Sequence, residues 1–178
     1  MYIYNRPKHN VFISFDHHDD QKYKDYIDKY LSNNIINKSV KPGEYDSDNS
    51  DNYIKRLIRE DKIRPSSVVI VLVGPNTKNR KHVDWEIYAG LSPSINGNSG
   101  LIAIMLPEMR IAPNGKYYRA DIPPRLADNI ESGYADCYNW YYAIQHFDSI
   151  IEKAFQNKNS RKSLIDNSRL QMQYNRGE

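Results

Sequence analysis

The sequence predicts an α/β domain of three layers, with a central parallel sheet in the strand order 2-1-3-4-5 and helices on both faces. Residues 67–73 and 101–106 are continuous apolar runs, which are typical of strands buried on both faces. Residues 10–15 form a third run, rich in β-branched and aromatic side chains. Segments of helical period separate these runs, and such alternation of strands and helices is typical of a parallel sheet covered on both sides.

The first predicted helix follows residues 10–15. Its apolar residues recur at i, i+3, i+4, i+7 and i+8, and Asp19 or Asp20 is placed to cap its start. These apolar residues are Tyr23, Tyr26, Ile27, Tyr30 and Leu31. A second helix is marked by Ile54, Leu57 and Ile58 and is entered through Ser50 or Asp51.

The remaining elements follow in the same alternation. A third helix is predicted over residues 83–91 and a longer last helix over residues 144–155. Pro123 and Pro124 are typical of the entrance to a further short helix, because proline is well tolerated in a first turn. The weak second strand is expected within residues 35–45, and a fifth near residues 134–138.

The length of 178 residues suits one domain, which we place at residues 1–158. Residues 159–178 are poor in apolar side chains and are expected to form a peripheral or mobile tail. The chain has 25 Lys and Arg against 22 Asp and Glu, a formal net charge of +3, and its charges are mostly interspersed. This balance is too mild to indicate a nucleic-acid partner. The one marked local bias is acidic: Glu44, Asp46, Asp48 and Asp51.

The longest strongly apolar runs reach about a third of the ~20 residues that a bilayer span needs, so no membrane association is expected. The N-terminus lacks the basic and apolar regions of a secretory signal. Cys137 is the single cysteine, which excludes an intrachain disulfide. These features predict a cytoplasmic protein.

The strand order predicts where a ligand would bind. In the flavodoxin-like order 2-1-3-4-5, ligands bind outside the carboxyl ends of strands one and three, where the order reverses. The chain is unusually polar just after these strands, in residues 16–20 (DHHDD) and residues 74–82 (GPNTKNRKH). We therefore expect the functional groups in these two loops and in the helix that follows the second of them.

Glu86 is the most informative position in that helix. It lies between Val83 and Ile87, on the side that turns toward the sheet, so its carboxylate can project into the crevice. The alternative is a solvated glutamate on the helix surface, favoured only by the helix dipole.

Other motifs give weaker signals. Residues 17–20 (HHDD) suggest a metal site, but no spaced His or Cys pair completes one, so a helix cap and polar loop are expected and no metal. Residues 46–51 do not match a calcium loop, because Asp51 stands where glycine is required. Cys137 is predicted to be a buried, inert thiol and His146 a partly buried structural residue.

Three segments together carry a resemblance to a known family. Residues 11–15 (VFISF) with their polar loop, 66–77 (SSVVIVLVGPNT) and 79–87 (NRKHVDWEI) resemble TIR-like domains of bacterial antiphage systems, in particular those of Thoeris systems. The resemblance covers about residues 9–106 and fades afterwards. It implies a TIR-like fold over the predicted domain.

The resemblance also implies an activity. Such proteins cleave NAD between nicotinamide and ribose on phage infection, and they release a cyclic ADP-ribose isomer or an ADP-ribose conjugate that activates an effector protein. NAD is then the substrate, and no cofactor is implied. A phage-derived trigger and self-association are further expected partners. By this resemblance Glu86 is the catalytic residue, and the substrate-binding positions are Phe15, Asp16, His17, Asp46 and Trp85.

Two other functions remain open. A TIR-like interaction module without catalysis would use the same face to recruit a partner, with Glu86 as a surface charge. A nucleoside deoxyribosyltransferase-like enzyme would use a glutamate nucleophile on free nucleosides and would ignore NAD.

Overall fold

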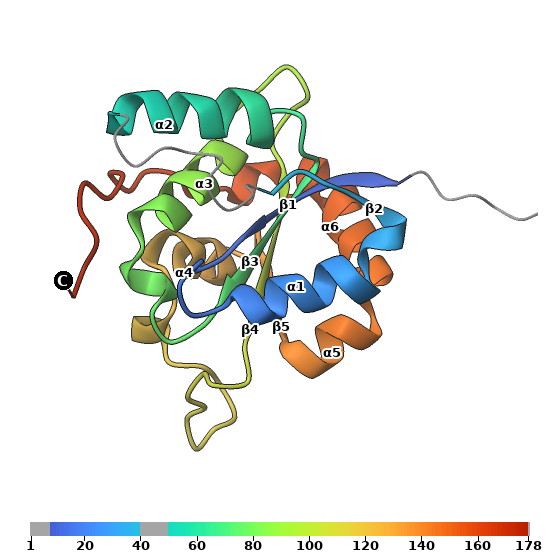
Figure 1. The fold of residues 1–178 in the computed structure, drawn as a ribbon, viewed down its shortest axis with the longest axis vertical. Coiled ribbons are helices and arrows are strands. Elements are labelled where there is room, and N and C mark those ends of the chain that lie inside the picture. Colours follow the sequence, from blue (N-terminus) through green and yellow to red (C-terminus); the bar gives the residue numbers. More distant parts are fainter. Residues whose placement is uncertain (1–7, 40–49, 178) are drawn as a thin grey trace, which may run out of the picture.

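The computed structural model describes residues 8–39 and 50–177 and contains a five-stranded sheet in the order β2-β1-β3-β4-β5 (Figure 1). Its strands are β1 (His9–Ser14), β2 (Ile35–Asn37), β3 (Val68–Val73), β4 (Gly100–Met105) and β5 (Asp136–Asn139). Every neighbouring pair is parallel. The predicted fold class and strand order are therefore confirmed.

Helices cover both faces of the sheet, as three layers require. They are α1 (Gln21–Tyr30), α2 (Asp51–Leu57), α3 (Lys81–Leu91), α4 (Pro124–Glu131), α5 (Trp140–Gln145) and α6 (Phe147–Ser160). Helices α1, α5 and α6 lie on one side of the sheet, and α2, α3 and α4 lie on the other (Figure 1). The Ser50 hydroxyl caps α2 by accepting a hydrogen bond from the Tyr53 N–H, as predicted, and α2 continues into a π-helical segment, Ile58–Ile63.

The alternation of side chains along the strands divides the core into two clusters. On β3, Val69, Val71 and Val73 face α2, α3 and α4, and the intervening residues face α1, α5 and α6. All six residues of β3 and all six of β4 are buried. This explains their continuous apolar sequence, because neither face of a central parallel strand meets water.

The predicted single last helix is wrong. The chain leaves helical geometry at His146, whose φ is −120° and ψ is 25°, and two helices, α5 and α6, result. Apolar spacing does not reveal this break, because Ala143 before it and Phe147 after it both face the same core cluster. His146 itself is exposed rather than partly buried, with its ring centroid 4.3 Å from that of Tyr142.

Cys137 is exposed, so its predicted burial is also wrong. Strand β5 is an edge strand, and Cys137 and Asn139 are exposed along it. Desolvation by neighbouring groups and the Asp136 carboxylate raise the pKa of the thiol to about 11, which keeps it protonated.

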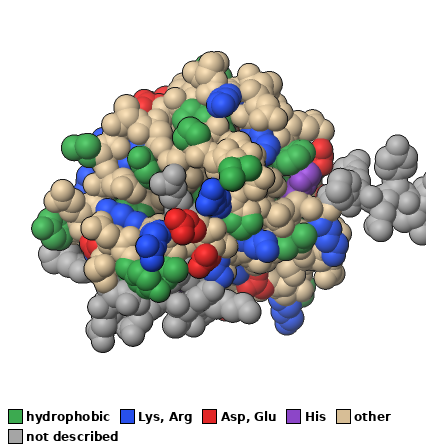
Figure 2. All heavy atoms as spheres, turned by 90° about the horizontal axis from the view of Figure 1, so that it is seen from above, with side chains coloured by type: hydrophobic (Ala, Val, Ile, Leu, Met, Phe, Trp, Pro, Cys, Tyr) green, Lys and Arg blue, Asp and Glu red, His purple; other side chains and the backbone are tan. Residues whose placement is uncertain are grey.

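The surface carries mixed charge. In the view from above, Lys and Arg side chains are scattered among neutral and acidic ones, in agreement with the interspersed charges of the sequence (Figure 2). Within residues 8–39 and 50–177, no helix has the length and apolar character needed to cross a membrane.

Close packing of α6 on β4 makes Gly100 a sensitive position. A Cβ at Gly100 would lie 2.4 Å from the Ala154 carbonyl oxygen, so α6 would have to move away from the sheet. Because overpacking of this kind costs about 1–3 kcal/mol, we expect Gly100→Ala to lower the Tm by about 5 °C. Ile95→Ala is the control, since Ile95 is 88% exposed in the preceding loop. Equal melting temperatures of the two variants in calorimetry would contradict this packing.

Candidate functional site

The two polar loops predicted at the carboxyl edge of the sheet are joined by hydrogen bonds. Arg80 Nε donates to Asp16 Oδ2 at 2.8 Å, and Asn76 Nδ2 donates to Asp19 Oδ2 at 2.7 Å. The first loop follows β1 and the second follows β3, the neighbouring strands at which the sheet order reverses. The structure thus brings these polar groups together at the position where open parallel sheets bind ligands.

Asp20 holds the second loop against the first. Its carboxylate accepts a hydrogen bond from Thr77 Oγ1 at 3.2 Å, and Thr77 Oγ1 in turn accepts from the Gly74 N–H at 2.8 Å. A Cβ at Gly74 would lie 2.5 Å from Asp20 Oδ1, so this contact requires glycine. Burial raises the pKa of Asp20 to about 6, and the hydrogen bond from Thr77 opposes that rise.

The predicted capping role of Asp20 is wrong in one respect. Asp20 stands at the N-cap position of α1, but its side chain makes no capping hydrogen bond. The carboxylate is instead engaged by Thr77, from a loop that lies 57 residues further along the chain.

Glu86 lies behind these loops, on the side of α3 that packs against the sheet. It is 4% exposed, and Ser14 Oγ of β1 donates a hydrogen bond to Glu86 Oε2 at 2.5 Å. Burial raises the pKa of Glu86 to about 8, while the hydrogen bond from Ser14 favours the charged form and limits the rise. The alternative of a solvated surface glutamate is therefore wrong, because this carboxyl group is buried at the switch point.

Ser14 is a site residue that the sequence analysis missed. It is 1% exposed and lies on the same side of β1 as Phe12, which faces α2 and α3. A signal was present in the sequence: Ser14 is a polar residue at an inward-facing position of an otherwise apolar strand. Such a buried hydroxyl needs a partner, and Glu86 supplies it.

The predicted substrate-binding residues of the first loop lie near this edge in different settings. Asp16 is 3% exposed and also accepts a hydrogen bond from the His18 N–H. Phe15 belongs to the core cluster on the opposite face of the sheet from Glu86, and its ring centroid lies 4.1 Å from that of His17. Partial burial lowers the pKa of the His17 imidazole, so its ring is neutral at neutral pH. Asp46 lies outside the described residues.

Trp85 points away from this edge. Its Nε1 donates to the Met172 carbonyl oxygen at 2.8 Å, and the ammonium groups of Lys55 and Lys81 lie 4.5 and 5.1 Å from its ring centroid. In the described part of the chain, no hydrogen bond or ring contact joins Trp85 to the Glu86–Ser14 pair. The structure thus brings together Asp16, His17 and the two loops, and it places Trp85 elsewhere.

The acidic and imidazole side chains of the described residues do not gather into a metal-binding cluster. His18 Nδ1 and Asp19 Oδ1 lie 2.6 Å apart in a local pair. In the two described segments, no group of three or more His, Cys, Asp or Glu side chains is arranged to hold a metal ion. The described arrangement therefore offers acid–base and electrostatic chemistry through a buried carboxyl group.

A comparison with protein families shows the family of this chain. The model of the family described as "Thoeris protein ThsB, TIR-like domain" matches residues 12–111, which is more than half of the chain. The chain belongs to this family. The matched segment begins in β1, ends after β4, and includes both loops, Ser14 and Glu86. Comparisons with curated proteins and with solved structures found no match.

Membership of the ThsB TIR-like family makes this chain a TIR-like antiphage defence protein. The family match also agrees with the sheet, whose order 2-1-3-4-5 is that of TIR-like folds. Strand β5, helices α4 to α6 and the C-terminal residues lie beyond the matched segment.

The burial of Glu86 predicts a pH-dependent stability difference. The folded protein keeps the Glu86 proton up to about pH 8, whereas the ordinary pKa of 4.5 applies to the unfolded chain. The folded state thus binds more protons between these pH values, and the wild type loses stability as the pH rises through them. Glu86→Gln is neutral at every pH. We therefore expect the Tm of Glu86→Gln minus that of the wild type to be about 5 °C more positive at pH 8.5 than at pH 5.

Differential scanning calorimetry at both pH values measures this difference. Glu131→Gln is a control, since the Glu131 side chain is 57% exposed on α4. A Tm difference between Glu86→Gln and wild type that is the same at pH 5 and pH 8.5 would show that the carboxyl group ionises normally.

Proposed function

We propose that this chain cleaves NAD at the bond between nicotinamide and ribose, with Glu86 as the catalytic residue. The proposal rests on the buried side chain of Glu86, which lies where β1 and β3 end and accepts a hydrogen bond from Ser14 Oγ at 2.5 Å. Family membership supports the same activity class, because the match spans the whole of this arrangement.

The chemistry suits a single carboxylate. Nicotinamide leaves as a neutral group, so the reaction needs no strong general acid. The barrier lies in the positive charge that develops on the ribose C1′–O4′ unit, as in other glycosidic cleavages. A carboxylate held beside this charge, or bonded to the ribose diol, stabilises the transition state more than the ground state.

The proton on Glu86 links binding to catalysis. In the free protein, burial keeps the pKa of Glu86 near 8, so the group is largely protonated at neutral pH. The nicotinamide ring of NAD is cationic, and a positive charge beside a buried carboxyl group favours its charged form. Substrate binding therefore releases the proton and produces the carboxylate where it is needed.

The loops and the strand hydroxyl preorganise this site. Ser14 fixes the orientation of Glu86, and the Asp16–Arg80 and Asp20–Thr77 contacts hold the two loops together. Exclusion of water decides whether water or an adenosine oxygen attacks the ribose, and thus whether the product is linear or a cyclic ADP-ribose isomer. In a defence system this product, or an ADP-ribose conjugate, would activate an effector after a phage-derived trigger.

The burial of Glu86 also bears on the interaction-module alternative. A recruiting surface needs accessible charges, but Glu86 is 4% exposed and faces the sheet. The deoxyribosyltransferase-like alternative differs in substrate, because it predicts turnover of free nucleosides with no dependence on NAD. Assays with both substrates distinguish these possibilities.

Loss of the carboxylate should abolish catalysis while the fold is kept. Glutamine retains the shape of Glu86 and accepts the hydrogen bond from Ser14, but it carries no charge to stabilise the transition state. We expect Glu86→Gln to lower nicotinamide release at least about 100-fold, with Glu131→Gln at the wild-type rate. Chromatography of NAD incubated with the purified protein and phage-infected lysate measures release, and unchanged release by Glu86→Gln would refute the assignment.

The pH profiles should separate the free and bound states of Glu86. Because kcat/KM reports the free enzyme, we expect it to rise with pH up to an apparent pKa near 8. The profile of kcat should have a lower apparent pKa, since the cationic substrate favours the carboxylate. Ser14→Ala removes the hydrogen bond that favours the charged form, so its kcat/KM profile should shift to higher pH. Identical profiles for kcat and kcat/KM would contradict substrate-linked proton release.

A further inference from the structure

The C-terminal residues do not leave the domain but run back along α4 and α3 (Figure 1). We call residues 166–176 the C-terminal strap. Its contacts begin at α4 and end at the N-terminal end of α3, where the Arg176 N–H donates to the Asn79 carbonyl oxygen at 2.9 Å. The strap thus reaches the second loop of the candidate site.

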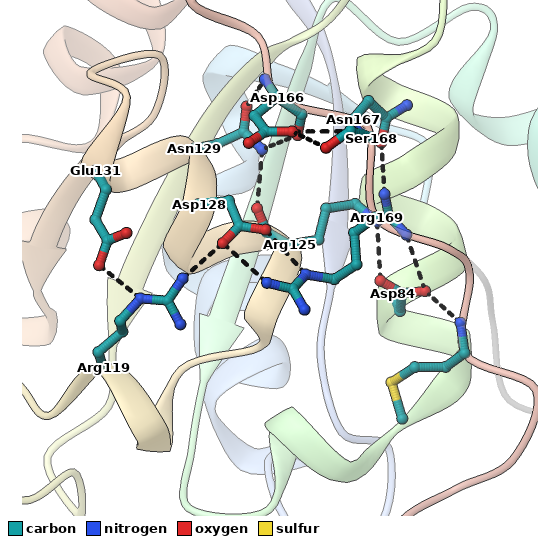
Figure 3. A network of polar contacts seen from close by, with 11 residues as sticks. Asp84, Arg119, Arg125, Asp128, Asn129, Glu131, Asp166, Asn167, Ser168 and Arg169 are labelled. Atoms are coloured by element: carbon teal, nitrogen blue, oxygen red, sulfur yellow. Dashed lines mark hydrogen bonds and ion pairs between the residues drawn. The ribbon is translucent and has the colours of Figure 1, made fainter.

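The strap is anchored to α4 by side-chain hydrogen bonds (Figure 3). Asn129 donates to the Asp166 carbonyl oxygen at 2.7 Å and accepts from the Asp166 N–H at 3.0 Å. Arg169 binds both oxygens of Asp128, at 2.9 and 3.1 Å. This reciprocal and bidentate pairing fixes the register of the strap on α4.

Further contacts attach the strap to α3. The Met172 N–H donates to Asp84 Oδ2 at 2.8 Å, and the Met172 carbonyl oxygen accepts from Trp85 Nε1 at 2.8 Å. The Lys81 N–H, at the first residue of α3, donates to Asn175 Oδ1 at 3.0 Å. The backbone of Met172 is therefore held between two successive side chains of α3.

The strap also completes a buried ion pair. Arg125 of α4 is fully buried and donates from Nε to Asp84 Oδ1 at 2.9 Å, and Asp84 is 4% exposed (Figure 3). The strap supplies a further partner to each member of this pair. The Met172 N–H donates to Asp84, and Asn167 Oδ1 accepts from Arg125 Nη1 at 2.9 Å. A buried ion pair needs such additional partners, because desolvation of both charges is costly.

Asp84 and Glu86 lie on different sides of α3. Residues two positions apart in an α-helix are separated by about 200° around its axis. Glu86 is hydrogen-bonded to Ser14 on the sheet side, and Asp84 is hydrogen-bonded to Arg125 and the strap on the outer side. At the turn that carries Glu86, helix α3 is thus held by hydrogen bonds on both of its sides.

We propose that Asp84 is a positioning residue for Glu86, and that the C-terminal strap acts through it to hold α3 against β1. The catalytic consequence rests on the proposed function, but the positioning itself does not. Without the Met172 N–H, Asp84 loses one of its buried partners, and α3 is held less firmly on its outer side. Water then reaches Glu86, and the distance between Glu86 and Ser14 varies.

A pair of proline substitutions in the full chain tests this proposal. Met172→Pro removes the N–H that binds Asp84. Leu170→Pro is the matched control: Leu170 is 91% exposed, and its N–H forms no hydrogen bond with any other described residue. The readout is the titration of the Glu86 carboxyl carbon by NMR of protein carrying 13C-labelled glutamate, with Glu86→Gln used to assign the signal.

We expect Met172→Pro to lower the pKa of Glu86 by about one unit, towards its ordinary value, and Leu170→Pro to leave it unchanged. We also expect kcat for nicotinamide release to fall about tenfold in Met172→Pro with little change in KM. An unchanged Glu86 titration in Met172→Pro would overturn the proposal, even if that variant melted at a lower temperature. A shifted titration in a protein whose wild type does not cleave NAD would support positioning and refute the proposed function.

Trp85→Phe provides a second test if Met172→Pro does not fold. It keeps the aromatic ring beneath Lys55 and Lys81 but removes the donor to the Met172 carbonyl oxygen. We expect a smaller shift of the Glu86 titration in the same direction. Tyr174→Phe is the control, since Tyr174 is 78% exposed on the strap. Equal titrations in these two variants would overturn the proposal.

Discussion

The hydrogen bond between Ser14 and Glu86 is the contact on which the rest of the site depends. It joins the first strand to α3 across a buried interface, and it stabilises the charged form of a buried carboxyl group. A buried carboxyl group in such a setting requires a closely held helix, because any gap would admit water and restore ordinary ionisation. The packing of α3 on the sheet therefore sets the chemistry of Glu86.

Both sides of α3 contribute to this constraint. On the sheet side, the loops after β1 and β3 are joined through Asp16–Arg80 and Asp20–Thr77, and they form the polar edge at which we propose that the dinucleotide binds. On the outer side, Asp84 is held by α4 and the C-terminal strap. Family membership gives this geometry its context, since the matched segment contains the loops and Glu86 but ends well before the strap.

The sequence predicted the features that follow from local pattern. The buried strands and the place of Glu86 on α3 derive from apolar periodicity, and the assumed flavodoxin-like strand order then predicted where the site lies. The Ser14–Glu86 contact joins residues 72 positions apart, and no periodicity reports such a pairing. Hydropathy likewise did not reveal the strap, because Met172 is held there through its backbone N–H and carbonyl oxygen. The break at His146 was hidden because both helices bury apolar residues in one cluster.

Comparison of the small molecules in phage-infected cells is the most direct test of the central claim, that Glu86 makes this chain an NAD-cleaving enzyme. Cells carrying the wild-type chain or Glu86→Ala would be infected, and their nucleotides separated by chromatography coupled to mass spectrometry. We predict a new ADP-ribose species, with loss of NAD, in cells that carry the wild type and in none that carry the variant. The same new species in both, or a constant NAD level in both, would contradict the account.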